Sequence, residues 1–269
     1  MVIGRMGRGV IVAAVTGGFV AALSLTQPVL AQRGGGPPPG PPQSPWASAP
    51  IDMTGYWVSI VNEDWRWRMV TPPKGDTSSV PLNAEGTKVA NAWDPASDGS
   101  CLAYGAAGLM RIPTRLHITW ENENTLKIET DAGQQTRRLM FDPATPAPAQ
   151  KTLQGFSRAQ WERVGAGGRG APGGGAVGPI TNPRGGDLRV NTNNLTAGWL
   201  RKNGVPYSDT ATMTEYFDRF AAPNGDEWLV VTTIVSDPRF LNTDFITSTH
   251  FRREPSAAKW DPTPCKPIT

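Results

Sequence analysis

Runs of residues that alternate between apolar and polar side chains fill most of this chain and constrain its fold more than any other feature. The runs are rich in Val, Ile, Thr, Tyr, Phe and Trp, and turn-forming stretches such as "ENEN", "TDAG" and "APNGD" separate them. A period of two is typical of strands with one buried face. We expect about nine strands, at residues 55–61, 64–70, 115–121, 125–130, 134–141, 187–192, 212–220, 227–235 and 245–253.

Turn and helix signals complete the predicted architecture. Asn224-Gly225 is expected at the tip of a hairpin between the strands at 212–220 and 227–235. One segment, residues 82–93, has a helical pattern, with Asn83 as its N-cap and Asp94-Pro95 after its end. The sequence therefore predicts a mainly β protein: a single antiparallel β-barrel or strongly bent sheet with one or two short helices.

The N-terminus has the pattern of a secretory signal peptide. Arg5 and Arg8 precede an apolar run, and Val29 and Ala31 occupy the small-residue positions before a cleavage point. We therefore expect residues 1–31 to be removed by cleavage after Ala31 and the protein to be periplasmic or secreted. The alternative is an uncleaved membrane anchor, but the apolar run is short and contains two glycines. No stable membrane anchor is expected after cleavage.

Two low-complexity segments bound and interrupt the expected domain. Residues 32–50 form a Gly/Pro-rich spacer and residues 164–186 a Gly-rich insert, and neither contains enough large apolar groups to fold alone. We expect both to be disordered. The remainder, residues 51–269, is predicted to be one β domain, because its length without the insert lies within the range of a single barrel or sandwich.

The charge of the chain argues against a nucleic-acid partner. The full sequence has 26 basic and 23 acidic residues. Cleavage after Ala31 would remove Arg5 and Arg8 and no acid, which leaves 24 basic residues against 23 acidic ones. A nucleic-acid interface needs Lys and Arg gathered on one face. The short basic stretches here, "RWR" and "FRRE", are mixed with acids.

The two cysteines, Cys101 and Cys265, are predicted to form a disulfide. In an oxidising compartment an isolated pair is usually bridged. The bridge would fix the Pro-rich tail "WDPTPCKPIT" to the first third of the domain. A metal site and a reactive thiol are the alternatives, although no neighbouring metal ligands accompany either cysteine in the sequence.

Gly55-Tyr56-Trp57 begins the first expected strand, and lipocalins and related calycin barrels begin theirs with a similar Gly-x-Trp. The resemblance implies that Trp57 closes one end of a barrel and packs beneath an arginine of the last strand. Here Arg252 or Arg253 could be that arginine, in a cation–π contact worth about 1 kcal/mol.

A wider resemblance covers most of the chain from about residue 51 to Cys265, without the Gly-rich insert. The segments "DMTGYWVSIVNEDWRWRMVTPPKG", "RLHITWENENTLKIETDAGQQTR", "GWLRKNGVPYSDTATMTEYFDRF" and "PNGDEWLVVTTIVSDP" resemble a family of uncharacterised exported bacterial proteins. The resemblance implies a secreted single domain and assigns no catalytic residue.

Residues 64–70, "DWRWRMV", leave two arrangements open. In a strand, Trp65 and Trp67 share one face, and Arg66 and Arg68 share the other. The indoles could face the core while the arginines pair with acids such as Glu63 or Asp64. Alternatively, the arginines could face the barrel interior and bind an anion.

Catalytic candidates are few. His117, His250 and Glu215 lie on polar strand faces, and if their strands were neighbours they could act as acid and base or as a metal site. No His-x-His or His-x-x-x-His spacing supports a metal, and neither a nucleophile motif nor a phosphate loop is present in the sequence. We therefore predict no metal site and no cofactor, and favour a protein that is not an enzyme.

The predicted function is the binding of a small apolar or aromatic molecule inside the barrel. Ten tryptophans supply rigid apolar surface for such a ligand. Two alternatives remain open: a barrel enzyme that acts by acid/base catalysis on a small organic substrate, and a structural or interaction module of the cell envelope. The residues predicted to line the site are Trp65, Trp67, Arg115, His117, Trp120, Tyr216, Trp228 and His250.

Overall fold

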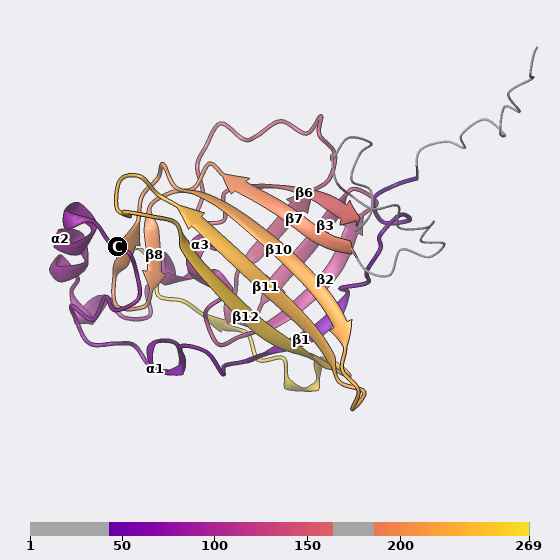
Figure 1. The fold of residues 1–269 in the computed structure, drawn as a ribbon, viewed down its shortest axis with the longest axis horizontal. Helices are drawn as coiled ribbons and strands as arrows, with labels where there is room; N and C mark the ends of the chain where they lie inside the picture. Colours follow the sequence, from indigo (N-terminus) through magenta and orange to yellow (C-terminus); the bar gives the residue numbers. More distant parts are fainter. Residues whose placement is uncertain (1–42, 164–185, 269) are drawn as a thin grey trace, which may run out of the picture. The chain divides into compact units, whose positions relative to one another are not determined.

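The computed structural model describes residues 43–163 and 186–268, and their strands form a closed barrel (Figure 1). Nine strands follow one another around it in the order β1-β12-β11-β10-β7-β6-β5-β3-β2. The predicted mainly β barrel is thereby confirmed. The strands are β1 Gly55–Ile60, β2 Arg115–Asn122, β3 Thr125–Thr130, β5 Thr136–Met140, β6 Phe156–Arg163, β7 Gly186–Asn193, β10 Thr212–Ala221, β11 Glu227–Ser236 and β12 Phe245–Glu254.

One neighbouring pair departs from the predicted antiparallel arrangement. Strands β5 and β6 run parallel, with Leu139 opposite Ser157. Parallel neighbours need a connection that returns along the sheet, and the segment 141–155 between them makes that return. The other barrel pairs are antiparallel, including the β10–β11 hairpin, whose turn contains Asn224 and Gly225 as predicted.

The prediction of a strand at residues 64–70 is wrong. Asp64 has a left-handed backbone (φ 52°), and Trp65–Arg68 form a single helical turn, α1. Arg68 is buried there, and its Nε donates to the carbonyl oxygen of Arg111. Because the segment is helical, its Trp and Arg side chains point in several directions around the turn and do not form the two opposite faces of a strand. The ninth barrel strand is β6, which the sequence analysis did not identify.

Helical segments and two further short sheets lie outside the barrel wall. The predicted helix is present as α2, Ala84–Ala92, and the side chain of Asn83 accepts from the backbone N–H of Gly86 at 2.9 Å, so the predicted N-cap is confirmed. A second short helix, α3, is Ala106–Leu109. Figure 1 shows α2, α3 and the short strand β8 (Gly198–Arg201) together at one end of the barrel. The remaining elements are the 3-10 helices Pro95–Ser97, Cys101–Tyr104 and Ala257–Lys259, and the strand pairs β8 Gly198–Arg201 with β9 Val205–Tyr207 and β4 Ala132–Gly133 with β13 Thr263–Pro264.

The core has two parts. Side chains inside the barrel form the first, which is centred on residues such as Trp57, Ile128 and Phe217, all fully buried. The second lies at the end that α3, β8 and β9 cover, and it includes Leu200, Tyr207 and Phe245. We refer to this end as the capped end. The strands bury their inner apolar faces against one another in the first part. In the second part the covering segments and the end of the barrel bury their apolar side chains against each other.

Trp57 lies in the core inside the barrel. It is fully buried, and its Nε1 donates to the carbonyl oxygen of Met53 at 2.9 Å. Arg253, its partner across the β1–β12 ladder, places its guanidinium carbon 5.7 Å from the centre of the indole ring. Of the two predicted arginines, Arg253 is therefore the one that packs on Trp57.

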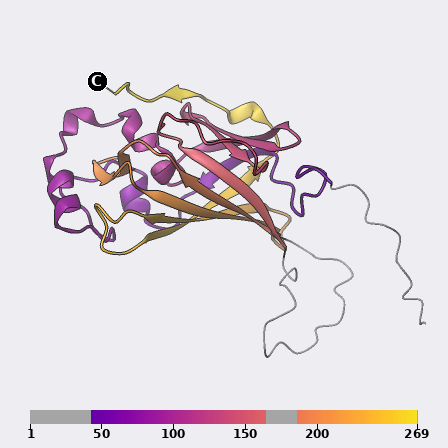
Figure 2. The same ribbon diagram turned by 90° about the horizontal axis from the view of Figure 1, so that it is seen from above.

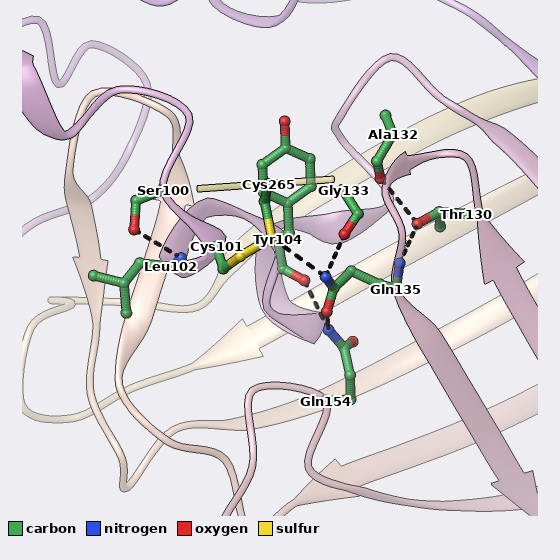
Figure 3. The surroundings of a disulfide bond; sticks show 10 residues. All are labelled: Ser100, Cys101, Leu102, Tyr104, Thr130, Ala132, Gly133, Gln135, Gln154 and Cys265. Atoms are coloured by element: carbon green, nitrogen blue, oxygen red, sulfur yellow. Dashed lines mark hydrogen bonds between the residues drawn. A yellow bond between two sulfur atoms is a disulfide. The ribbon is translucent and has the colours of Figure 1, made fainter. Parts of the chain in front are cut away.

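The predicted disulfide between Cys101 and Cys265 is present and joins the C-terminal tail to the 3-10 helix that begins at Cys101 (Figure 3). Backbone hydrogen bonds strengthen this attachment, because the N–H of Cys101 donates to the carbonyl oxygen of Lys266 at 2.9 Å. Strand β13 of the tail pairs with β4. Figure 2 shows the tail, in yellow, running along the outside of the barrel.

The predicted signal peptide lies outside the described residues, as do the first part of the predicted spacer and all of the predicted insert except Gly186. Residues 43–50, the end of the predicted spacer, contact the barrel: the carbonyl oxygen of Pro45 accepts from Trp161 Nε1, and the N–H of Trp46 donates to Glu123. Within 43–163 and 186–268, no helix is long and apolar enough to cross a membrane.

Candidate functional site

The inner wall of the barrel changes character from one end to the other. Along β10, β11 and β12, buried side chains alternate with more exposed ones, so every second residue points inward. At one end the inward positions carry an aromatic group together with the ion-paired Arg219, Glu227 and Arg253. An apolar middle follows, and then a polar belt toward the capped end. These three levels decide where a ligand could lie.

Three aromatic side chains form the level farthest from the capped end, and we call them the aromatic mouth: Trp120, Phe141 and Trp161. Their ring centroids lie 5.2 to 6.4 Å apart, in tilted orientations. Trp120 is opposite Leu126 and Trp161 is opposite Leu188, both buried core residues, so the two indoles share the inner face. All three rings are only partly buried and pack against the apolar core.

The polar belt is organised by a buried ion pair. Arg137 from β5 and Glu215 from β10 are both inaccessible to solvent, and they form two hydrogen bonds of 3.0 and 2.6 Å. The hydroxyl oxygens of Ser157 and Thr192 each lie 3.4 Å from Nη2 of Arg137. A pair held in this geometry satisfies most of its hydrogen-bonding groups, as a buried charge requires.

The two histidines face outward from the barrel. His117 lies between Leu116 and Ile118, which are both buried inside, so its own side chain is on the outer face. There it stacks on Tyr56, with ring centroids 4.2 Å apart, and its Nδ1 is 3.3 Å from Glu129. His250 lies between two buried residues in the same way, and its Nδ1 is 3.1 Å from Glu63.

The other predicted lining residues are distributed over several surfaces. Arg115 is on the outer face and donates to Glu254 at 2.9 Å. Tyr216 lies between two buried inward residues, so it faces outward. Trp228 precedes buried Leu229 and is opposite exposed Arg252, so it too faces outward. Trp65 is 64% exposed on α1, whereas Trp67 contacts the capped end. Of the predicted ligand-binding residues, Trp120 is the one that faces the barrel interior.

The three catalytic candidates occupy three different environments. Glu215 is inside the barrel and bound by Arg137, His117 is on the outer face beside Glu129, and His250 is on the outer face beside Glu63. A catalytic acid and base must reach the same substrate atoms, and no contact joins these three side chains in the described structure. Within the described residues, no group of three or more His, Cys, Asp and Glu side chains could hold a metal ion.

The inner residues that the sequence analysis missed had a signal in the sequence. In "TRRLMF", every second residue lies on the same strand face, which carries Arg137, Leu139 and Phe141. Placing Leu139 in the core would therefore have placed the other two inside the barrel as well. In "FSRAQWER" the inward residues Ser157, Ala159 and Trp161 also alternate with outward ones, but small and polar side chains dominate this segment and give only a weak strand signal.

No protein-family model, curated protein or solved structure matches this chain. The resemblance to exported bacterial proteins and to lipocalins therefore stays a prediction.

Proposed function

We propose that the protein binds a small apolar or aromatic molecule at the aromatic mouth of the barrel. The observation that carries this proposal is the convergence of Trp120, Phe141 and Trp161, whose rings face inward and remain partly exposed. Ligand sites in barrels commonly lie at the mouth, and they are lined by aromatic and apolar side chains. A ligand ring could pack against the exposed parts of these three rings in a similar offset or edge-on orientation.

The surrounding structure supports an apolar ligand at this place. The mouth continues into the apolar core, where Leu126, Leu139 and Leu188 are buried. One polar group is fixed beside it, because Trp161 Nε1 already donates to Pro45 at 2.9 Å. The segment that contains Pro45 therefore forms one edge of the proposed site, and a ligand would be held mainly by apolar contact.

A titration with the neutral fluorescent probe N-phenyl-1-naphthylamine tests the proposal. We expect saturable binding of about one probe per chain, with the blue-shifted emission of an apolar environment. Trp120→Ala removes one wall of the site and should weaken binding at least about tenfold, since burying a large side chain against a ligand contributes on the order of 2 kcal/mol. Trp228→Ala is the matched control, because this indole is on the outer face.

Two results would contradict the proposal. The first is a wild-type protein that gives no saturable signal with the probe, which would favour a packed module of the cell envelope. The second is equal loss of binding in Trp120→Ala and Trp228→Ala, which would place the probe on the outer surface. A circular dichroism spectrum of each variant separates loss of binding from loss of folding.

A further inference from the structure

A pocket lies beside the disulfide, where the C-terminal tail meets the segment that leads into the 3-10 helix at Cys101. Its volume is about 280 Å³, close to the lower end of the range for small-molecule sites. We call it the tail pocket, and it is lined by Ala96, Ser97, Ser100, Leu102, Trp199, Lys266, Pro267 and Ile268. The last three residues belong to the tail, so the pocket is complete only while the tail is attached.

The tail is held in place although its side chains bury little surface. All of residues 261–268 except Cys265 are exposed. Nevertheless, the disulfide and two backbone hydrogen bonds fix Lys266, whose N–H donates to Gly99 at 2.8 Å and whose carbonyl oxygen accepts from Cys101 at 2.9 Å. Apolar burial, the common reason for a docked terminus, does not account for this attachment. A ligand site that needs the tail as one wall would account for it.

One part of the lining is apolar and open to solvent. Leu102 and Trp199 are partly exposed, and Ile268 is 54% exposed. The indole of Trp199 packs edge-on against buried Trp93, with ring centroids 6.4 Å apart, which fixes its orientation. A fixed indole with neighbouring aliphatic side chains offers a surface on which the flat ring of a ligand can pack.

The polar part of the lining has two groups that are free to bind an anion. Among the described residues, no acceptor or acidic group bonds the ammonium group of Lys266. Ser100 is 7% exposed, and its hydroxyl oxygen accepts from the N–H of Leu102 at 3.3 Å (Figure 3). No acceptor for the hydroxyl hydrogen is present in the described part of the chain. Ser100 and Lys266 pair in an isolated β-bridge, so the two groups come from neighbouring backbone positions.

We infer that the tail pocket binds a small aromatic carboxylate. A carboxylate oxygen accepts hydrogen bonds from both an ammonium group and a hydroxyl group, which Lys266 and Ser100 supply. The aromatic ring of the ligand would pack on Trp199 and the aliphatic side chains beside it. The positive charge of Lys266 favours an acid over a neutral aromatic compound of the same size.

The tail pocket shares no residue with the aromatic mouth, so the two sites can be tested independently. The mouth is lined by apolar rings and is proposed to bind a neutral molecule. Trp120→Ala should therefore leave benzoate binding unchanged, and a change in the tail pocket should leave the binding of N-phenyl-1-naphthylamine unchanged. The failure of either proposal is distinguishable from the failure of the other.

A titration with benzoate, followed by the indole N–H signal of Trp199 in two-dimensional ¹⁵N NMR, tests the inference. The buffer contains no other carboxylate. We expect a saturable shift of this signal, and a much smaller one with benzyl alcohol, a neutral compound of similar shape. Because Lys266 is exposed, raising the salt concentration should weaken benzoate binding.

Lys266→Met should weaken benzoate binding about fivefold, which corresponds to the loss of one exposed charge pair. Lys259→Met is the matched control, because this lysine of the same tail is 73% exposed and does not line the pocket. Replacing Cys101 and Cys265 by serine should also weaken binding, since backbone hydrogen bonds alone would then hold the tail wall. A circular dichroism spectrum of each variant checks its folding.

Three outcomes would overturn the inference. They are a Trp199 signal that benzoate does not shift saturably, benzyl alcohol that binds as tightly as benzoate, and equal benzoate affinity in Lys266→Met and Lys259→Met. If the serine variant does not fold, the comparison of the two ligands and that of the two lysine variants still decide the question.

Discussion

Breaking the buried ion pair between Arg137 and Glu215 should destabilise the barrel far more than breaking an exposed pair of similar geometry. Both side chains are 0% exposed, so Glu215→Leu leaves a buried guanidinium without its counter-charge. Such a change costs about 3–5 kcal/mol. In a domain of this size each kcal/mol corresponds to roughly 2–4 °C, which predicts a fall in Tm of about 6–20 °C.

Replacing both partners should restore most of this stability. In Arg137→Met/Glu215→Leu no buried charge remains, and a buried pair replaced by apolar groups of similar volume is often neutral or stabilising. We expect the double variant to lie within about 1 kcal/mol of the wild type. A double-mutant cycle of urea unfolding, followed by tryptophan fluorescence with the disulfide intact, would then give a coupling energy of about 3 kcal/mol or more.

The chain contains a matched control in the next residue. Arg138 also forms two hydrogen bonds with one carboxylate, to Glu121 at 2.8 and 3.0 Å, but these side chains are 50 and 37% exposed. Glu121→Leu should cost less than about 1 kcal/mol. Two results would contradict this prediction: a cost for Glu215→Leu no larger than that for Glu121→Leu, or simple addition of the two buried single substitutions in the double variant.

Further substitutions test other parts of the fold by the same urea unfolding assay. Trp57→Ala should cost about 3–5 kcal/mol because it leaves a large cavity, and a loss below about 1 kcal/mol would mean that the barrel core does not depend on this indole. Replacing Cys101 and Cys265 by serine should cost about 2–5 kcal/mol, and unchanged stability would show that the tail is held without the bridge. Gly198→Ala should cost about 1–3 kcal/mol, because its Cβ would lie 2.5 Å from the hydroxyl oxygen of buried Tyr207; a neutral result would show that the tyrosine moves freely.

The barrel could be predicted because alternation is a local signal. Eight of its nine strands were recognised from runs such as 212–220 and 227–235, where the turn residues fix the hairpin as well. Trp57 and its arginine could be anticipated from the Gly-x-Trp pattern and a basic last strand. The disulfide followed from the number of cysteines and the expected compartment.

The site residues were harder to predict because alternation does not say which face is inside. Tyr216 and Glu215 are neighbours in one strand, yet Glu215 is buried and Tyr216 faces outward. The register with the neighbouring strands decides between the two faces, and a shift by one residue would reverse it. The prediction of a strand at residues 64–70 was wrong for a different reason. The helical turn there buries Arg68, and this burial depends on a tertiary contact with Arg111 that the local sequence does not reveal.

The claim that the barrel has an apolar site at its mouth can be tested by one measurement. Two-dimensional ¹⁵N NMR resolves the indole N–H signals of the tryptophans while N-phenyl-1-naphthylamine is added. We predict that the probe shifts the signals of Trp120 and Trp161 and leaves unchanged that of Trp228, which lies on the outer face. The proposal is contradicted if none of these signals moves, or if the signal of Trp228 moves as much as the other two.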